Sequence, residues 1–488
     1  MTDEDIAATA SSATGATLPS PLKNKALEAG ETTRTPVNGH GAGHNGIPSA
    51  TKVNGHDVEC VTIAVVGAGQ RGLAYATFAL KHPDLAKVIA VAEPRTHRRK
   101  VMTRAHSISE EMQFSDYKDL LAKGKVADAV LICVMDDLHA PLVTEFSKQG
   151  YHILCEKPMA TSISDCVKMV KEVESGEKKV FGIGHVLRYS PYNREIKAVI
   201  DSGVLGEIVN IQHIEPVGNR HFVHAFVRGN WHKEKETSFA LMTKCCHDID
   251  ILSFYLSGLT PSRVSSFGSL NHFKPSQKPA QAGNATRCQD CAYAEECVWS
   301  AKKIYVDTLN DADERERRAK HVVDADILDI ENVTEALETS PYGRCVYEAG
   351  NDVVDHQVVL IEYEGGVTAS MTMSAFTEDI CDRGTKIHGT KGELIGDMRT
   401  FTWTDDDFGW TVHTPPNDGG GHGGGDTGLA RAFIRAVATN DQSVLNVTAQ
   451  EVLNSHLLVF AGEQARKERR VVEFGEFKER ALLGRNGV

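Results

Sequence analysis

The sequence predicts an α/β protein in which a doubly wound parallel sheet is followed by a C-terminal α/β domain with a large, mostly antiparallel, open sheet. Short apolar runs alternate with helical stretches from about residue 58, and a glycine-rich turn follows the first of these runs. Beyond about residue 185 the expected strands alternate polar and apolar residues and are separated by glycine turns. These patterns predict a disordered tail at 1–57, the parallel-sheet domain at 58–187 and the second domain at 188–488, with a cysteine-containing insertion at about 271–350.

Composition indicates an acidic globular chain with a polar start. Its 488 residues are 41% hydrophobic, enough for about two ordinary cores, and its net charge of −13 argues against nucleic acid or an anionic membrane as the main partner. The sequence contains no run of ~18 apolar residues, so we expect no membrane span. Residues 1–57 are rich in Ala, Ser, Thr, Gly and Asn and resemble neither a secretory signal nor an arginine-rich transit peptide, so we expect a cytoplasmic protein.

The first apolar run, 61–66, is typical of a strand buried on both faces, and it leads into a glycine-rich loop. Gly67 permits a tight turn, Gly69 lets the backbone approach a pyrophosphate, and Gly72 lets the next helix pack closely. N–H groups at the start of that helix would then receive the phosphate charge. The loop therefore predicts a dinucleotide site, and a glycine-rich turn without a ligand is the alternative.

The residue that follows the second expected strand, 87–92, is Glu93. A carboxylate at this position accepts hydrogen bonds from ribose hydroxyls and repels a 2′-phosphate, which favours NAD over NADP. Three arginines come directly afterwards and leave NADP possible: Arg95, Arg98 and Arg99.

Three more apolar runs, 129–134, 152–155 and 180–184, complete the expected parallel sheet, with helices at about 138–149 and 162–174. Ligands of such sheets bind at the carboxyl ends of the strands. The polar segments that follow the first two runs directly should therefore lie beside the nicotinamide. We expect the cofactor to contact Gly67, Gly69, Gln70, Arg71, Gly72, Glu93, Asp136, His139 and Glu156.

The second domain is expected to begin with a helix at about 191–201 and a strand at 208–213. Further strands are expected at 357–363, 367–374 and 384–388, separated by turns such as Glu364-Gly365-Gly366. Alternating strands joined by short turns predict antiparallel pairing.

Together these motifs resemble the glucose-fructose oxidoreductase, inositol dehydrogenase and rhizopine-catabolism family (Gfo/Idh/MocA). The motifs that carry the resemblance are the glycine loop, Glu156-Lys157-Pro158, Arg188-Tyr189-Ser190-Pro191 and Cys246-His247-Asp248-Ile249-Asp250. The resemblance implies a Rossmann domain that binds NAD(P), and a second domain that covers the substrate and often mediates dimers or tetramers. It also implies oxidation or reduction of a carbinol in a sugar, cyclitol or related polyol.

By position, Lys157 matches the family's active-site lysine and His247 its usual acid/base histidine. Removing hydride from a carbinol carbon requires a base at the hydroxyl, and a nearby ammonium stabilises the developing alkoxide. The alternatives are a solvated loop lysine and a hydrogen-bonded helix histidine. We expect the substrate to contact Lys157, Arg188, Tyr189 and His247.

One departure from the family pattern lies just before the histidine. Many relatives have an aspartate four residues earlier, where this chain has Thr243, and Lys244 comes next. Helical spacing predicts that Lys244 and His247 share one stripe, so we expect Lys244 to join the catalytic site and to depress the pKa of His247. The alternatives are that Lys244 points to solvent, and that Asp248 and Asp250 orient His247 or are surface acids.

Most of the eleven cysteines lie in apolar surroundings and are expected to be small core residues. Cys288, Cys291 and Cys297 lie instead on a polar loop, with Cys345 further on. This spacing predicts a closed tetrahedral zinc site whose sulfurs lie within about 4 Å of each other. Free or redox-active thiols and an iron–sulfur cluster are the alternatives.

The segment from Gly419 to Asp426 is rich in glycine and contains His422. Its backbone freedom suits a loop that closes over a ligand or meets a neighbouring subunit, with His422 and Asp426 as candidate substrate contacts; a flexible linker is the alternative. Three classes of function remain: a polyol dehydrogenase or reductase, an NAD-dependent glycosidase or epimerase with transient oxidation, and a noncatalytic dinucleotide sensor.

Overall fold

The computed structural model describes residues 52–53, 56–57, 60–175, 178–312, 315–323, 327–407, 409–417 and 419–484. The predicted disordered tail, 1–57, lies outside the described residues except for two short strands, β1 (Lys52–Val53) and β2 (His56–Asp57), which pair antiparallel. Among the described residues, no helix is long and apolar enough to cross a membrane.

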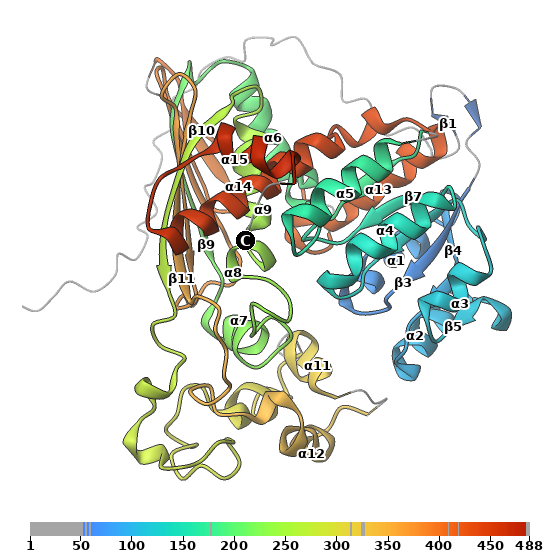
Figure 1. Ribbon diagram of the computed structural model, residues 1–488, viewed down its shortest axis with the longest axis vertical. Coiled ribbons are helices and arrows are strands. Elements are labelled where there is room, and N and C mark those ends of the chain that lie inside the picture. Colours follow the sequence, from blue (N-terminus) through green and yellow to red (C-terminus); the bar gives the residue numbers. More distant parts are fainter. Residues whose placement is uncertain are drawn as a thin grey trace, which may run out of the picture. The chain divides into compact units, whose positions relative to one another are not determined.

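The first sheet has six strands, all parallel, in the order β5-β4-β3-β6-β7-β8. Its strands are β3 (Val61–Val66), β4 (Ala86–Ala92), β5 (Gln113–Phe114), β6 (Ala129–Ile132), β7 (His152–Cys155) and β8 (Phe181–Ile183). The connecting helices are α1 (Gln70–Lys81), α2 (Thr96–His106), α3 (Tyr117–Ala122), α4 (His139–Lys148) and α5 (Ile163–Glu174) (Figure 1). Strands spread to both sides of β3, so the prediction of a doubly wound sheet is confirmed.

Secondary-structure elements with many buried residues have a clear sequence pattern, whereas exposed elements do not. All four residues of β6 are buried, and a strand covered on both faces is a continuous apolar run. The helix α2 buries only Met102 and has the polar sequence THRRKVMTRAH, so its amphipathic period is faint. The sequence therefore gives no clear signal for α2.

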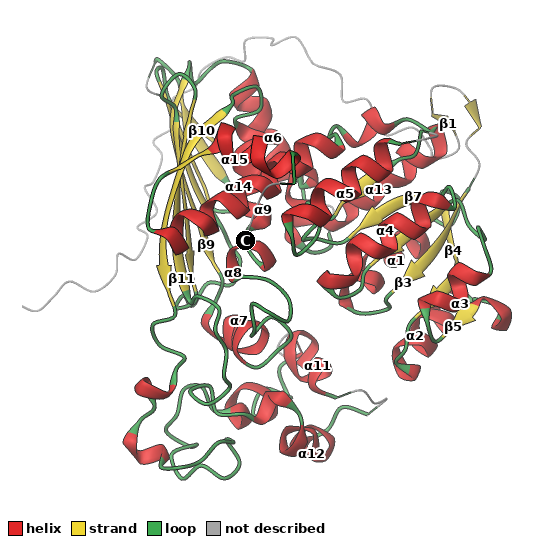
Figure 2. Cartoon of the chain, viewed as in Figure 1, coloured by secondary structure: helices red, strands yellow, loops and turns green. Residues whose placement is uncertain are grey.

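The second sheet has nine strands in the order β16-β15-β14-β13-β9-β12-β11-β10-β17. All its neighbours pair antiparallel except β12 and β9, which confirms the predicted mostly antiparallel sheet (Figure 2). The strands are β9 (Ile208–Pro216), β10 (Pro261–Ser269), β11 (His356–Tyr363), β12 (Thr368–Ser374), β13 (Gly384–Gly389), β14 (Glu393–Gly396), β15 (Phe401–Thr404), β16 (Trp410–His413) and β17 (Val472–Glu473).

Helices cover one face of this second sheet (Figure 1). They are α6 (Pro191–Asp201), α8 (Ala240–Thr243), α9 (Cys246–Tyr255), α14 (Ala449–Glu468) and α15 (Phe474–Leu482), and α13 (Gly425–Thr439) packs against α1 of the first domain. On the other face the alternating side chains stay exposed, among them Ile214, Phe267 and Leu360.

The long connection between β10 and β11 contains the predicted cysteine insertion. Its helices include α11 (Lys320–Val322) and α12 (Ile330–Thr339), and α7 (Asn219–Phe222) lies nearby at the end of the sheet (Figure 1). An isolated bridge between Arg287 and Arg344 brings the two ends of the cysteine region together.

Candidate active site

The glycine-rich loop has the shape that a dinucleotide requires. Gly67 has a φ of +92°, and a Cβ there would lie 2.3 Å from the carbonyl oxygen of Cys133. A Cβ at Gly72 would lie 2.0 Å from the carbonyl oxygen of Gly67, so both positions require glycine. The helix α1 starts immediately after Gly69, which makes no side-chain cap, and the first turn of the helix carries no acidic residue. N–H groups at this helix end are therefore suited to phosphate oxygens.

Glu93 lies against this loop at the end of β4 and is buried. Its carboxylate accepts from the N–H of Ala68 at 2.8 Å and from the backbone N–H and Nε of Arg95, both at 3.0 Å. The guanidinium of Arg98 comes within 3.6 Å of the position that a Cβ on Gly69 would take. The acid and an arginine therefore both border the phosphate loop.

Arg71 lies between two carboxylates. Its Nε donates to Glu156 at 2.8 Å, and its Nη1 and Nη2 each donate to Asp426 at 3.0 Å. Burial lowers the pKa of Arg71, but the neighbouring acids outweigh it and the net shift is upward. The expected cofactor residues Arg71 and Glu156 thus form a charge network with Asp426, which joins the start of α13 to the phosphate loop. No local signal in the sequence linked Arg71 to Asp426.

The loop that carries Lys157 is held from both sides. His139 donates from Nδ1 to the carbonyl oxygen of Pro158 at 2.7 Å, and the N–H of Met159 donates to Nε2 of His456 at 2.8 Å. Nζ of Lys157 donates to the carbonyl oxygen of Thr243 at 2.7 Å. The loop lysine is therefore positioned toward the second domain.

Trp231 is a site residue that the sequence analysis missed. Its Nε1 donates to Asp136 at 2.9 Å, and Nζ of Lys157 lies 5.9 Å from the centre of its ring. Burial raises the pKa of Asp136, although His139 and Lys157 oppose the shift. A single tryptophan in the polar segment after α7 gave no periodic or motif signal.

His247 is buried in the first turn of α9. The pKa of His247 is lowered well below 6.5, mainly by burial and next by the charge of Lys157. The imidazole is therefore neutral near pH 7. Its Nδ1 is buried and makes no hydrogen bond with any residue that the structure describes. The ring of His422 lies 5.5 Å away. His422 in turn donates to Asp426 at 3.0 Å, so the glycine-rich segment meets both the histidine and the phosphate loop.

The prediction for Lys244 was wrong in its geometry. The helix α8 ends at Thr243 and α9 begins at Cys246, so Lys244 and His247 do not lie on one continuous helical stripe. Nζ of Lys244 instead pairs with Glu215 at 3.2 Å and donates to Sγ of Cys381 at 2.9 Å. The leading charges that lower the pKa of His247 are those of Lys157, His422, His185 and Arg383. Lys244 is thus held by its own partners.

Two expected substrate contacts are bonded inside the protein. Arg188 forms a two-pronged ion pair with Asp250, with N–O distances of 2.6 and 2.8 Å, and Tyr189 donates to the carbonyl oxygen of Leu445 at 2.9 Å. These contacts bind the segment after β8 to α9 and to the short 3-10 helix Gln442–Leu445 that precedes α14, so both side chains have partners inside the protein.

The two aspartates after His247 also have other partners. Asp250 is paired with His185 and Arg188, and Asp248 with His213 and Arg383. Neither orients His247, because the helix turns both carboxylates toward buried cations. They are core ion pairs rather than surface acids.

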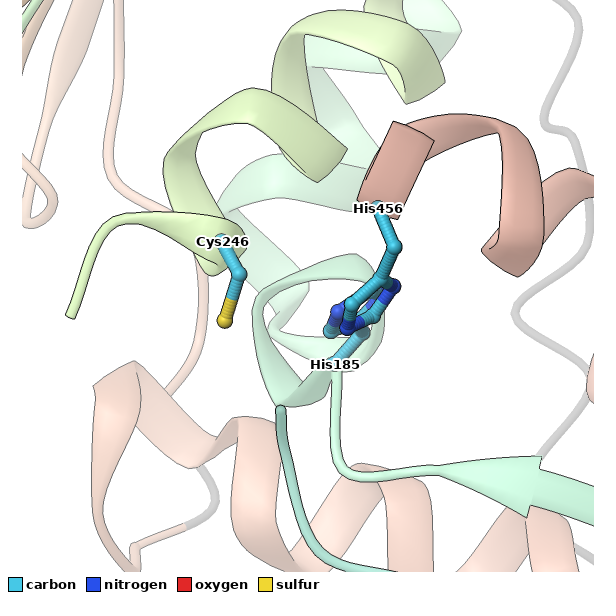
Figure 3. A group of neighbouring side chains, drawn as sticks. All are labelled: His185, Cys246 and His456. Carbon is cyan, nitrogen blue, oxygen red and sulfur yellow. The ribbon is translucent and has the colours of Figure 1, made fainter. Parts of the chain in front are cut away.

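His185, Cys246 and His456 form a buried group (Figure 3), and the ring centre of His185 lies 6.0 Å from that of His247. One potential ligand atom from each of these three side chains lies within 4.8 Å of the other two. No other group of three or more such side chains comes this close within the described ranges. The two imidazoles stack, with ring centres 5.0 Å apart. Both nitrogens of His456 already bond to the backbone of Met159 and Val452, so this group supports the Lys157 loop.

The four cysteines predicted to bind zinc, Cys288, Cys291, Cys297 and Cys345, line one small cavity of the insertion. Burial raises the pKa of the Cys297 and Cys345 thiols, and each is raised further by Cys288. No three of their sulfurs meet within 4.8 Å among the described residues, so the expected approach to about 4 Å is not found.

Comparison with known families gives two matches. The model described as "Oxidoreductase family, NAD-binding Rossmann fold" matches residues 61–185, and "Oxidoreductase family, C-terminal alpha/beta domain" matches residues 197–474. The chain is 30% identical over 218 residues to the 2,7-anhydro-N-acetylneuraminate hydratase of Escherichia coli, which covers 44% of this chain and 55% of the relative. It is 30% identical over 210 residues to the inositol 2-dehydrogenase of Rubrobacter xylanophilus, and this match covers 41% of this chain and 53% of the relative. The chain thus spans about half the length of these two relatives.

A solved structure of a levoglucosan dehydrogenase with NADH and levoglucosan superposes with a TM-score of 0.62 at 16% identity. The match covers 85% of this chain and 99% of that one. At this identity the likeness shows the fold.

Proposed function

Because the chain belongs to the Gfo/Idh/MocA family of oxidoreductases, we propose that it is an NAD(P)-dependent dehydrogenase or reductase of a sugar, cyclitol or related polyol. The observation that carries the proposal is that Lys157 donates to the carbonyl oxygen of Thr243, four positions before a buried His247 whose pKa the lysine charge lowers. Lys157 follows β7, at the end of the parallel sheet where ligands of such sheets bind, which supports the proposal.

The two side chains divide the proton and charge chemistry of the carbinol. A bound nicotinamide would supply the hydride acceptor. His247 takes the hydroxyl proton, and burial keeps its imidazole neutral before the reaction. Lys157, fixed by the carbonyl of Thr243, stabilises the negative charge that develops on the oxygen. In the reverse direction the same imidazole returns the proton.

The loop residues fit the dinucleotide. Gly67, Gly69 and the start of α1 would hold the pyrophosphate, and Glu93 would meet the adenosine ribose. Asp136 and His139 follow β6 and would lie near the nicotinamide. Nε2 of His139 is a buried polar atom with no partner among the described residues, as a ligand-facing atom would be.

A second candidate is a reaction with no net oxidation, such as that of an NAD-dependent glycosidase or epimerase in which the substrate is oxidised only transiently. Two relatives are named 2,7-anhydro-N-acetylneuraminate hydratases, and hydration changes no overall oxidation state. The same base and ammonium would serve such a reaction. A noncatalytic sensor would need neither residue.

We also propose that the chain forms a homo-oligomer, a dimer or a tetramer, through the uncovered face of its second sheet. Ile214, Phe267 and Leu360 expose 40, 69 and 46% of their surface there. Exposed apolar side chains on one sheet face favour association.

The test is a screen of inositols, aldoses, sugar acids, anhydrosugars and glycosides with NAD and NADP. Reduced nicotinamide and product are both measured. Net reduction of the cofactor supports the dehydrogenase, and product without net reduction supports the second candidate. His247→Ala should abolish either activity, whereas His388→Ala, a partly exposed histidine beside Glu393, should not. A screen in which the native enzyme and His247→Ala act equally well would contradict both.

A further inference from the structure

The connection between β10 and β11 brings four cysteines to one place. Cys288, Cys291, Cys297 and Cys345 all line the same small cavity, with Trp299 and Tyr347 beside them. The N–H of Cys288 donates to Gly343 at 2.9 Å, and the N–H of Cys345 donates to Thr286 at 2.8 Å. Backbone pairing therefore sets Cys345 beside Cys288, although 57 positions separate them in the sequence.

The cysteine segment has no hydrophobic core of its own. From residue 283 to residue 299 no side chain is classed as buried, and Val298 exposes 67% of its surface. Apolar burial therefore contributes little to ordering these residues against the conformational entropy that ordering removes. Small segments of this kind are commonly stabilised by a cross-link, either covalent or through a metal.

A buried arginine supplies the second, independent observation. Arg228 is 1% exposed, and its Nη2 donates to Sγ of Cys288 at 3.2 Å. Its other hydrogen bonds go to the carbonyl oxygens of Arg344 and Trp299, each at 2.7 Å. Nη1 is buried and makes no hydrogen bond with the residues described. Burial raises the pKa of Tyr305, and the charge of the guanidinium opposes that shift.

The charge of Arg228 therefore meets no carboxylate partner in the described part of the chain. A buried cation without an anion is costly, so its surroundings should contain negative charge. Among the described residues that line the adjoining cavity, the side chains that most readily become anions are the four cysteines, followed by Tyr293 and Tyr347. Four thiolates bound to one Zn²⁺ carry a net negative charge, as the neighbourhood of Arg228 requires. Hydrogen bonds donated by nearby N–H groups to the ligand atoms commonly support such metal sites.

We propose that Cys288, Cys291, Cys297 and Cys345 bind one Zn²⁺ as a closed, structural tetrathiolate site. Each thiol loses its proton to solvent as the metal binds, and the resulting anionic cluster is the missing partner of Arg228. The sulfurs turn inward from the walls of the cavity to reach bonding distance, which their position on a loop permits. Four protein ligands leave no open position, so the ion stabilises the insertion and takes no part in the reaction.

The experiment measures the zinc content of the full-length protein by mass spectrometry after extensive dialysis. We expect about one zinc per chain. Cys291→Ser should lose most of the zinc, because the substitution removes one of the four thiolate ligands. Cys291 is only partly buried, so the substitution should disturb packing little. Cys60→Ser, which changes a partly buried cysteine outside the insertion, should keep the zinc.

Cobalt substitution of the native protein avoids dependence on any variant. Tetrahedral thiolate-bound cobalt gives strong visible absorption, which we expect here, and Arg228→Met should shift it because an N–H donor to sulfur is lost. Native protein without zinc and without this absorption would overturn the proposal. So would disulfides between these cysteines, or iron with labile sulfide, since both use the same thiols.

Discussion

Nζ of Lys157 donates to the carbonyl oxygen of Thr243 at 2.7 Å, which ties the loop after β7 to the segment just ahead of His247. The contact crosses from the parallel-sheet domain to the second domain. It places a fixed positive charge close enough to lower the pKa of His247. A main-chain oxygen of Thr243, four positions before His247, thus holds the lysine near the histidine.

Replacing Lys157 should impair the chemical step more than binding. Lys157→Met removes the ammonium but keeps a similar length, so we expect kcat to fall by roughly 10²-fold or more while cofactor affinity changes little. Steady-state kinetics and a fluorescence titration of the cofactor measure the two effects. Lys148→Met, at an exposed helix position paired with Glu145, is the matched control. Near-native kcat in Lys157→Met would exclude a catalytic role for the lysine.

The acid side of the pH profile should report on His247. Because its folded pKa is lowered well below 6.5, the neutral base persists on acidification, and kcat/KM for carbinol oxidation should hold its plateau to below pH 6.5. Removing the charge of Lys157 raises this pKa, so Lys157→Met should shift the remaining acid limb to higher pH. A limb that does not move would assign the titration to another group. The measurement is kcat/KM between about pH 4 and 8.

Breaking the Arg71–Asp426 pair should loosen the cofactor loop. Asp426→Asn leaves Arg71 with Glu156 alone, and we expect a stability loss of about 1–3 kcal/mol together with weaker cofactor binding. Part of the arginine is exposed, so solvent screens the loss. Denaturant unfolding and cofactor titration give both values, and Glu145→Gln at an exposed ion pair is the control. If Asp426→Asn lowers stability by the expected amount but leaves cofactor affinity unchanged, Asp426 does not contribute to cofactor binding.

Glu93 should make NAD(H) bind more tightly than NADP(H). In Glu93→Gln the side-chain oxygen can still accept from Ala68, but the repulsion of a 2′-phosphate is gone, so the preference for NAD should shrink or reverse. Parallel titrations of both cofactors test this. Tighter binding of NADP by the native protein would show that Arg95 and its neighbours dominate.

Features that depend on residues near one another in the chain could be predicted from the sequence. The strand 61–66 could be recognised because a strand buried on both faces needs a run of apolar residues. The turn at Gly67 could be recognised because a positive φ favours glycine. Lys157 was placed at the correct end of the sheet for the same reason, since it follows the strand β7 directly.

The failures share a different cause. Helical spacing alone predicts that Lys244 and His247 share one stripe, but α8 ends at Thr243 and α9 begins at Cys246, and the Lys244 side chain pairs with Glu215 of β9. Nothing near Arg188 in the sequence reveals Asp250, 62 residues away, as its partner.

The sequence by itself therefore determined the two sheets, the dinucleotide loop and the positions of Lys157 and His247, because strand burial, glycine geometry and motif order are local properties of the chain. The tertiary structure alone decided which charges meet: Arg71 with Asp426, Arg188 with Asp250, and Lys244 with Glu215. An ion pair depends on the distance between groups that folding brings together, and neither residue of a pair carries a local mark of its partner.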